Sequence, residues 1–208
     1  MDQSDLRAVV FDIGETLVNE ERLWGLEAER VGVTPAALMA ALTTVIERGQ
    51  EHHELWELLG VTRPQPPIPL EPGDFYADAV PCLRALHDLG YQVGLAGNQP
   101  PMTDEFLRAL ELPADMIGSS GGWGVQKPST EFFVRICAEL GLAPHEVAYV
   151  GDRLDNDVLP AKAVGLFTVF VRRGPWGHRH ARLPAVAEAD LRIDELAALP
   201  ALLAERRD

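Results

Sequence analysis

The chain has few cysteines and no long apolar run. Two of its 208 residues are cysteine, and Cys82 and Cys137 each lie in an apolar helical pattern, without the paired spacing of a disulfide framework or a metal site. This spacing excludes a disulfide-rich scaffold and predicts two core thiols in a reducing compartment. No segment approaches the length needed to span a bilayer. We therefore expect no membrane partner.

Basic charge is also scarce. Lysine and arginine together number 18, against 32 aspartates and glutamates, and the net charge is −14. The basic clusters are no longer than Arg172-Arg173 and Arg206-Arg207, so the sequence predicts no nucleic-acid partner. An anionic substrate would have to meet a local positive site or a metal ion.

The first five residues carry neither a basic stretch nor an apolar run. Because a secretory signal needs both, the sequence predicts a cytoplasmic protein. A chain of this length with 47% apolar residues can bury one substantial core, with a small second lobe at most. The sequence does not predict an oligomeric state.

A helical pattern follows the first apolar strand. Thr34 is placed to cap a helix that has Pro35 in its first turn, and another helix is expected over residues 51–59. Five prolines then crowd into residues 62–73, too many for a helix or a central strand. We therefore predict a helical insertion with an extended, proline-rich return, residues 19–74.

From residue 78 onward, helices and strands alternate. Asp78 and Thr103 are expected to cap helices, and a last helix is expected from Asp194. Strands are predicted over residues 91–96, 116–118, 147–150 and 166–171. This alternation is typical of a parallel sheet with helices on both faces. The fold class is therefore α/β, with a Rossmann-like core of residues 1–18 and 75–208.

Three short segments end in residues that can carry chemistry. Residues 9–17 read VVFDIGETL and deliver Asp12 at the end of a strand; residues 147–157 read VAYVGDRLDND and deliver an acidic cluster. Between them, residues 124–128 read GVQKP and contain Lys127, one of only two lysines. Open α/β sheets place their sites at the carboxyl ends of strands. A lone aspartate there is more often a helix cap, but the three segments together indicate a site.

An aspartate, a lysine and an acidic pair in this order resemble the haloacid dehalogenase-like hydrolase superfamily over nearly the whole chain. The resemblance implies that Asp12 is a nucleophile that forms a covalent aspartyl intermediate, and that Lys127 holds phosphoryl oxygens. It implies that Mg²⁺ is bound by Asp12, Asp152 and the carbonyl of Gly14, with Asp157 acting behind them or through water. The helical insertion would be the cap that selects the substrate.

One departure from the family pattern concerns the oxyanion site. The family expects serine or threonine at the end of the second strand, where this chain has Gly97. A phosphoryl group would then be bound by the backbone N–H of Gly97 or by the amide of Asn98 or Gln99. The loss of one such donor typically lowers a rate by about 10²–10³.

The other departure concerns the general acid. Phosphatases of the superfamily carry a second aspartate two residues after the nucleophile, where this chain has Gly14. Glu15, or His52 or His53 from the insertion, are candidate replacements, although solvated surface histidines are the commoner case. Without an acid, the sequence predicts a steep dependence of rate on the acidity of the leaving group.

Three functions remain open from the sequence. The first is a Mg²⁺-dependent phosphatase for a small phosphorylated molecule. The second is a dehalogenase, which needs no acid but has no use for the acidic pair. The third is a non-catalytic phosphate-binding module, which would bind Mg²⁺ and phosphate without turnover. Asp155 is expected to be solvated, and Trp24, Trp123 and Trp176 are expected to pack without a role in the site.

Overall fold

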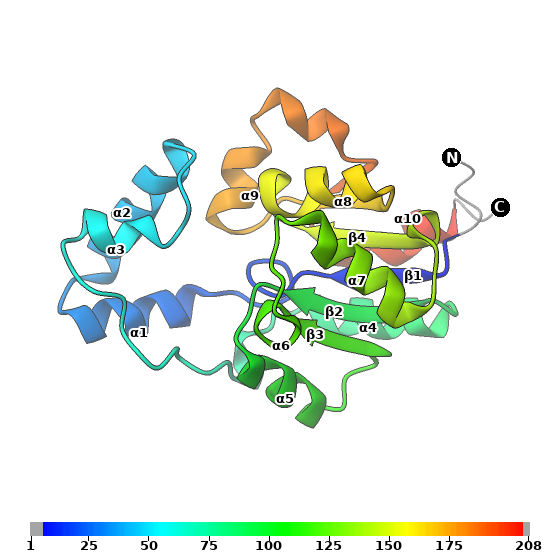
Figure 1. Ribbon diagram of the computed structural model, residues 1–208, viewed down its shortest axis with the longest axis horizontal. Helices are drawn as coiled ribbons and strands as arrows, with labels where there is room; N and C mark the ends of the chain where they lie inside the picture. Colours follow the sequence, from blue (N-terminus) through cyan, green and yellow to red (C-terminus); the bar gives the residue numbers. More distant parts are fainter. Residues whose placement is uncertain (1–5, 206–208) are drawn as a thin grey trace.

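A six-stranded parallel sheet forms the centre of the protein (Figure 1). The computed structural model describes residues 6–205, so the N-terminal segment from which a cytoplasmic location is predicted lies outside the described residues. The strands, in their order across the sheet, are β3 (Met116–Ser119), β2 (Gln92–Gly97), β1 (Ala8–Phe11), β4 (Val147–Gly151), β5 (Phe167–Val171) and β6 (Leu191–Ile193). Because the strand order reverses at β1, a crevice is expected at the carboxyl ends of β1, β2 and β4.

Helices cover both faces of the sheet, so the predicted α/β fold is confirmed. One face packs against α4 (Ala79–Asp88), α5 (Pro101–Ala109) and α10 (Leu199–Ala204), and the other against α7 (Thr130–Leu140) and α8 (Leu159–Val164). Along β1, Val9 and Phe11 enter the first core, whereas Ala8 and Val10 enter the second. Burial on both faces explains why this strand is a continuous apolar run.

The helical insertion after the first strand is also confirmed. It contains α1 (Glu21–Val31), α2 (Pro35–Glu47) and α3 (Glu54–Leu58), which lie to one side of the sheet in Figure 1. Thr34 caps α2 as predicted, since its hydroxyl accepts a hydrogen bond from the N–H of Ala37. These helices form a small core with Trp176, which comes from α9 (Gly174–His180) outside the insertion. The boundaries 19–74 remain a prediction.

The two segments that link the insertion to the sheet run side by side. Val18 forms an antiparallel bridge with Phe75, and the N–H of Asn19 donates to the carbonyl of Asp74. The Arg22 guanidinium donates to both oxygens of the buried Asp74 carboxylate, at 2.6 and 2.7 Å. The paired segments connect the insertion to the sheet, and we refer to them as the hinge; the Arg22–Asp74 ion pair links their two sides.

Of two predicted helix caps, Asp78 lies at the N-cap position of α4 as predicted but its side chain does not cap, and Thr103 is wrong. Asp78 precedes α4, but its carboxylate accepts hydrogen bonds from the side chain of Arg173 and the N–H of Leu196 and makes no capping bond. Thr103 lies inside the first turn of α5, because that helix already begins at Pro101. A proline is well suited to the first turn of a helix, where its missing N–H has no partner to lose.

The other differences between the predicted and the observed elements concern short helices and strands. The third helix begins at Glu54, three residues later than the expected 51, and the last helix is divided into a 3₁₀ turn, Leu196–Ala198, and α10. The chain after Arg153 forms a π-helical turn, Leu154–Val158, before α8. The elements α6 (Ser120–Trp123), α9 and β6 were not predicted. Each has seven residues or fewer, too few for hydrophobic periodicity to reveal it.

Two expectations from composition can be compared with the structure. Cys82 and Cys137 are both buried and free, as predicted for core thiols. Within residues 6–205, no single helix is long and apolar enough to cross a membrane. The pair α1 and α2 would together reach that length and composition, but the two helices meet at a bend of 110°.

The hinge ion pair predicts a pH-dependent stability. Arg22→Met removes the charged partner of the buried Asp74 carboxylate, which keeps the hydrogen bond from the N–H of Glu71, so the free energy of unfolding should fall by about 2 kcal/mol near neutral pH. Hydrogen bonds from Arg22 lower the pKa of Asp74 below its usual 3.8. The stabilisation is therefore present above pH 3.8 and is lost as the pH falls through the lowered pKa.

Urea unfolding of both proteins over an acidic pH series measures this difference. Arg48→Met, at the exposed end of α2, is the control and should unfold like the wild type. A difference between the Arg22 variant and the wild type that stayed constant in acid would contradict the assignment to Asp74.

Candidate active site

A buried lysine lies between two carboxylates at the carboxyl ends of the central strands. Asp12 directly follows β1, Asp157 lies in the turn after β4, and Lys127 precedes α7. Lys127 Nζ lies 2.7 Å from Asp12 Oδ1 and 2.6 Å from Asp157 Oδ1. The lysine is only 2% exposed. The structure therefore brings together three of the residues that the sequence singled out.

A third carboxylate joins this group. Asp12, Asp152 and Asp157 are all buried, and each offers an oxygen within 4.8 Å of the others. Asp157 already uses one oxygen on Lys127 and the other on the N–H of Arg153, at 2.9 Å. One lysine cannot neutralise three carboxylates, so the group fits a hard divalent cation held by oxygen atoms of Asp12 and Asp152.

The pKa values of these residues reflect the excess of negative charge in the site. Burial raises the pKa of Asp152 well above its usual range, and the negative charges of Asp157 and Asp12 add to this effect. Burial also raises the pKa of Asp12 to about 6, although the positive charge of Lys127 opposes it. For Lys127, burial lowers the pKa, but the charges of Asp12 and Asp157 outweigh burial and raise it well above its usual value. Lys127 therefore stays protonated.

The absence of a side chain at Gly97 leaves room for the Asp12 carboxylate. A Cβ added to Gly97 would lie 2.5 Å from Asp12 Oδ1 and 3.3 Å from the backbone nitrogen of Ile13. Real Cβ atoms are essentially never as close to a neighbour as the first of these distances. The position where the family carries a hydroxyl is therefore tied, in this chain, to the placement of the Asp12 carboxylate.

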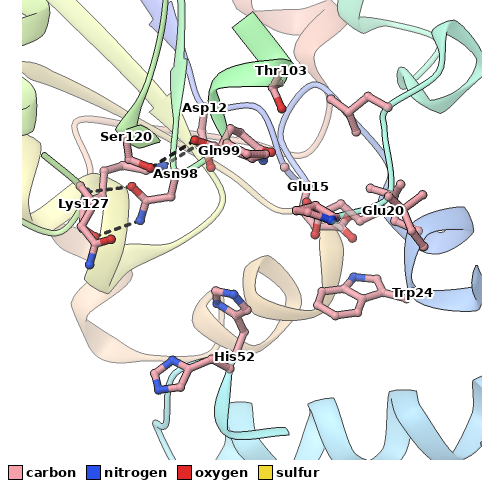
Figure 2. A pocket seen from close by; sticks show the side chains of 18 of the residues that line it. Asp12, Glu15, Glu20, Trp24, His52, Asn98, Gln99, Thr103, Ser120 and Lys127 are labelled. Atoms are coloured by element: carbon pink, nitrogen blue, oxygen red, sulfur yellow. Dashed lines mark hydrogen bonds and ion pairs between the residues drawn. The ribbon is translucent and has the colours of Figure 1, made fainter. Parts of the chain in front are cut away.

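Asn98 holds the backbone of Lys127. Its Oδ1 accepts a hydrogen bond from the Lys127 N–H, and its Nδ2 donates to the Lys127 carbonyl, both at 2.9 Å (Figure 2). One Nδ2 proton remains that could bind a substrate. Gln99 also lines the cavity, and its Nε2 would lie 3.6 Å from a Cβ at Gly14. The sequence-based assignment of Asn98 to substrate binding stays a prediction.

Glu15 lines the cavity above the site, but its carboxylate is already hydrogen-bonded. It has a φ of 53°, in the left-handed region, which turns the chain sharply after Gly14. Its Oε2 accepts a hydrogen bond from the Tyr76 hydroxyl at 2.7 Å, and its side chain packs so closely on Gly174 that a Cβ there would lie 2.6 Å from Glu15 Cβ. Burial raises the pKa of Glu15. Its carboxylate therefore has a structural partner.

A cavity of about 730 Å³ lies above these residues, between the core and the insertion. Trp24 and Trp176 line it and also pack in the core of the insertion, whereas Trp123 packs on Phe132, with the ring centroids 5.2 Å apart. His52 also lines the cavity and is partly buried, so the expected solvated histidine is wrong there. Burial lowers the pKa of His52 to about 4.

Sequence reasoning missed Glu20, the residue before α1. A Cβ added to Gly14 would lie 2.5 Å from Glu20 Oε1, so the carboxyl group of Glu20 occupies the space that a side chain at position 14 would fill. Burial, together with the charges of Glu15 and Asp12, raises the pKa of Glu20 to about 8. No motif marks Glu20, because its position depends on the turn between β1 and α1.

The sequence matches a known family and several of its phosphatases. The family described as haloacid dehalogenase-like hydrolase matches residues 6–165. The chain is 27% identical over 205 residues to a glyceraldehyde 3-phosphate phosphatase of Methanopyrus kandleri, covering 82% of this chain and 86% of that protein. It is 33% identical over 124 residues to a phosphoglycolate phosphatase of Salmonella typhi, covering 58% of this chain and 48% of that protein.

Solved structures share the fold. A phosphatase of the same superfamily from Thermococcus onnurineus is 23% identical, with 98% of this chain and 100% of that chain covered and a TM-score of 0.64. The magnesium-bound hydrolase YfnB of Bacillus subtilis is 18% identical, with coverage of 95% and 98% and a TM-score of 0.68. Because the family match spans β1 through α8 and includes Asp12, Lys127, Asp152 and Asp157, the chain belongs to the haloacid dehalogenase-like hydrolases.

Proposed function

We propose that the protein is a Mg²⁺-dependent phosphatase that hydrolyses a small phosphorylated molecule through an aspartyl-phosphate on Asp12. The contact of Lys127 Nζ with both Asp12 and Asp157, at the floor of a cavity, carries the proposal. It sets a fixed positive charge beside a carboxylate nucleophile, as phosphoryl transfer requires. The cavity volume of about 730 Å³ suits a small molecule, and the relatives named above are phosphatases of small phosphorylated compounds.

The reaction takes place in two steps. An Asp12 carboxylate oxygen attacks phosphorus, the bond from phosphorus to the leaving oxygen breaks, and that oxygen takes up a proton. A water molecule then attacks the phosphorus of the aspartyl-phosphate, loses a proton, and releases inorganic phosphate as the bond to Asp12 breaks. Lys127 offsets the negative charge that gathers between nucleophile and phosphoryl oxygens, and Asp157 holds Lys127 in place.

Asp12, Asp152 and the carbonyl of Gly14 would hold Mg²⁺. The buried, negatively charged cluster that they form with Asp157 supports this assignment. The ion, when bound, neutralises charge on the phosphoryl oxygens. The same cluster favours phosphoryl transfer over dehalogenation, because displacement of a halide from carbon has no use for a buried cation site.

A screen of metal-dependent phosphate release tests the function as a whole. The panel contains phosphorylated metabolites and aryl phosphates, each with Mg²⁺ and with chelator. Chelator-sensitive release of phosphate is the expected result. Binding of Mg²⁺ and phosphate without turnover on any compound would show a non-catalytic phosphate-binding protein and overturn the proposal.

Asp12→Asn should lower kcat/KM by on the order of 10⁴ or more, because an amide oxygen cannot form the covalent intermediate. The variant should also fail to form a beryllofluoride adduct at this position, which mass spectrometry under native conditions and fluorine NMR can detect. Asp88→Asn, on the exposed surface of α4, is the matched control and should behave like the wild type. Hydrolysis retained by the Asp12→Asn variant would rule out Asp12 as the nucleophile.

Asp152→Asn should weaken Mg²⁺ binding by at least about 100-fold, since loss of a direct ligand should exceed the 10–100-fold cost of losing a supporting residue. Titration calorimetry measures this without reference to activity. The apo variant should unfold at the same or a higher temperature, because a buried charge has been removed. Asp155→Asn, whose exposed carboxylate pairs with Arg153, is the control. Equal Mg²⁺ affinity in the Asp152 and Asp155 variants would contradict the metal assignment.

A further inference from the structure

The loop between β1 and α1 places a carboxyl group beside Gly14. A Cβ at Gly14 would lie 2.5 Å from Glu20 Oε1 and 3.1 Å from Glu20 Cδ. Gly14 does not have a positive φ, so its backbone conformation would allow a side chain. Only the Glu20 side chain occupies the space that such a side chain would need. Glycine at position 14 and glutamate at position 20 therefore fit together as a pair.

The backbone around Glu20 fixes this placement. The N–H of Asn19 is bonded to the hinge carbonyl of Asp74, and Asn19 Oδ1 accepts a hydrogen bond from the N–H of Glu21 at 2.8 Å. The carbonyl of Glu20 accepts the first helical hydrogen bond of α1, from the N–H of Trp24. The backbone of Glu20 is thus held between the hinge on one side and a helix on the other, and its side chain lines the cavity.

Glu20 faces the same cavity as Asp12. Both side chains line it, and Figure 2 shows the indole of Trp24 beside Glu20, with His52 across the cavity. The other candidate acids are less well placed. Glu15 also lines the cavity, but its carboxylate accepts a hydrogen bond from Tyr76 and its side chain packs on Gly174. His52 belongs to the wall formed by the insertion, next to Trp176 at 6.3 Å.

We propose that Glu20 is the proton-transferring residue of the phosphatase, in place of a side chain at position 14. This inference rests on the proposed function. As the bond from phosphorus to the leaving oxygen breaks, the Glu20 carboxyl group gives its proton to that oxygen and becomes a carboxylate. As water attacks the aspartyl-phosphate, the carboxylate takes the proton that the water loses, so each turnover restores Glu20.

The proposal changes the substrate range expected from Gly14 alone. A site without an acid favours leaving groups that depart unassisted, such as nitrophenolate. With Glu20 as donor, alkyl phosphates become substrates, because a poor leaving group gains about 10²–10⁴ from general acid help. The wild type should therefore show a shallow dependence of kcat/KM on the pKa of the leaving group.

Glu20→Gln tests this directly, since it keeps the size of the side chain and removes its transferable proton. The ratio of wild-type to variant kcat/KM is measured over a series of substituted phenyl phosphates and alkyl phosphates, so that differences in substrate binding cancel for each compound. The ratio should be near one for the most acidic leaving groups and rise to about 10²–10⁴ for alkyl phosphates. Glu21→Gln, at the adjacent exposed position, is the matched control and should give a ratio near one throughout.

An exchange of positions provides the second test. Glu20→Ala should show the same selective loss, and adding Gly14→Asp to it places a carboxyl group where the Glu20 carboxyl group was. The double variant should recover alkyl phosphate hydrolysis over the Glu20→Ala protein, although Gly14→Asp alone must displace Glu20. Recovered activity shows that the double variant is folded, so this test still holds if Glu20→Gln folds poorly. Circular dichroism and thermal unfolding check the fold of each variant.

The outcomes separate the inference from the function on which it rests. A Glu20→Gln loss that is equal for all leaving groups means that Glu20 positions substrate or hinge and moves no proton, which overturns the inference. The inference is also overturned if Glu20→Gln and Glu20→Ala both keep the wild-type dependence of kcat/KM on the pKa of the leaving group. It is overturned as well if the double variant does not recover alkyl phosphate hydrolysis. A wild type with no metal-dependent hydrolysis of any phosphate overturns the proposed function itself, and the inference with it.

Discussion

The ion contacts of one buried lysine organise the site. Lys127 is enclosed and touches Asp12 and Asp157 at 2.7 and 2.6 Å, so it joins the ends of β1 and β4 at the point where the strand order reverses. A buried charge is costly unless it is paired and hydrogen-bonded, and here a single cation stabilises two carboxylates. The charge of Asp152 is not offset by this lysine, and the remaining negative charge is the physical reason to expect a divalent cation.

The same contacts explain why two positions around the site are glycine. A side chain at Gly97 would collide with the Asp12 oxygen that meets Lys127, and a side chain at Gly151 would collide with Asp157. Asn98 completes the arrangement by bonding both the N–H and the carbonyl of Lys127. The departure from serine or threonine at position 97 thus leaves room for the Asp12 carboxylate beside the backbone of Gly97.

The sequence predicted the elements that have a periodic apolar pattern and the charged residues that follow a buried strand. Long helices and two-faced strands produce clear patterns, so the α/β core, the helical insertion and Asp12 with its charged partners could be recognised. The short α9 has no such pattern, and with it the place of Trp176 in the cavity was missed. Glu20 could not be found from spacing, because its approach to Gly14 depends on the left-handed backbone at Glu15 and on the bridge that closes the hinge.

The position of Glu20 joins the chemistry to the insertion. An acid at position 14 would belong to the loop that follows β1 in the core. Glu20 instead directly precedes α1, and its segment is tied to the return segment at Asp74. The insertion also contacts the core through Trp176, and Glu51 on it lies 3.6 Å from Arg153. In the arrangement that we propose, the insertion that lines the cavity also places the proton donor beside the leaving group, so enclosure of the substrate and proton transfer depend on the same segment.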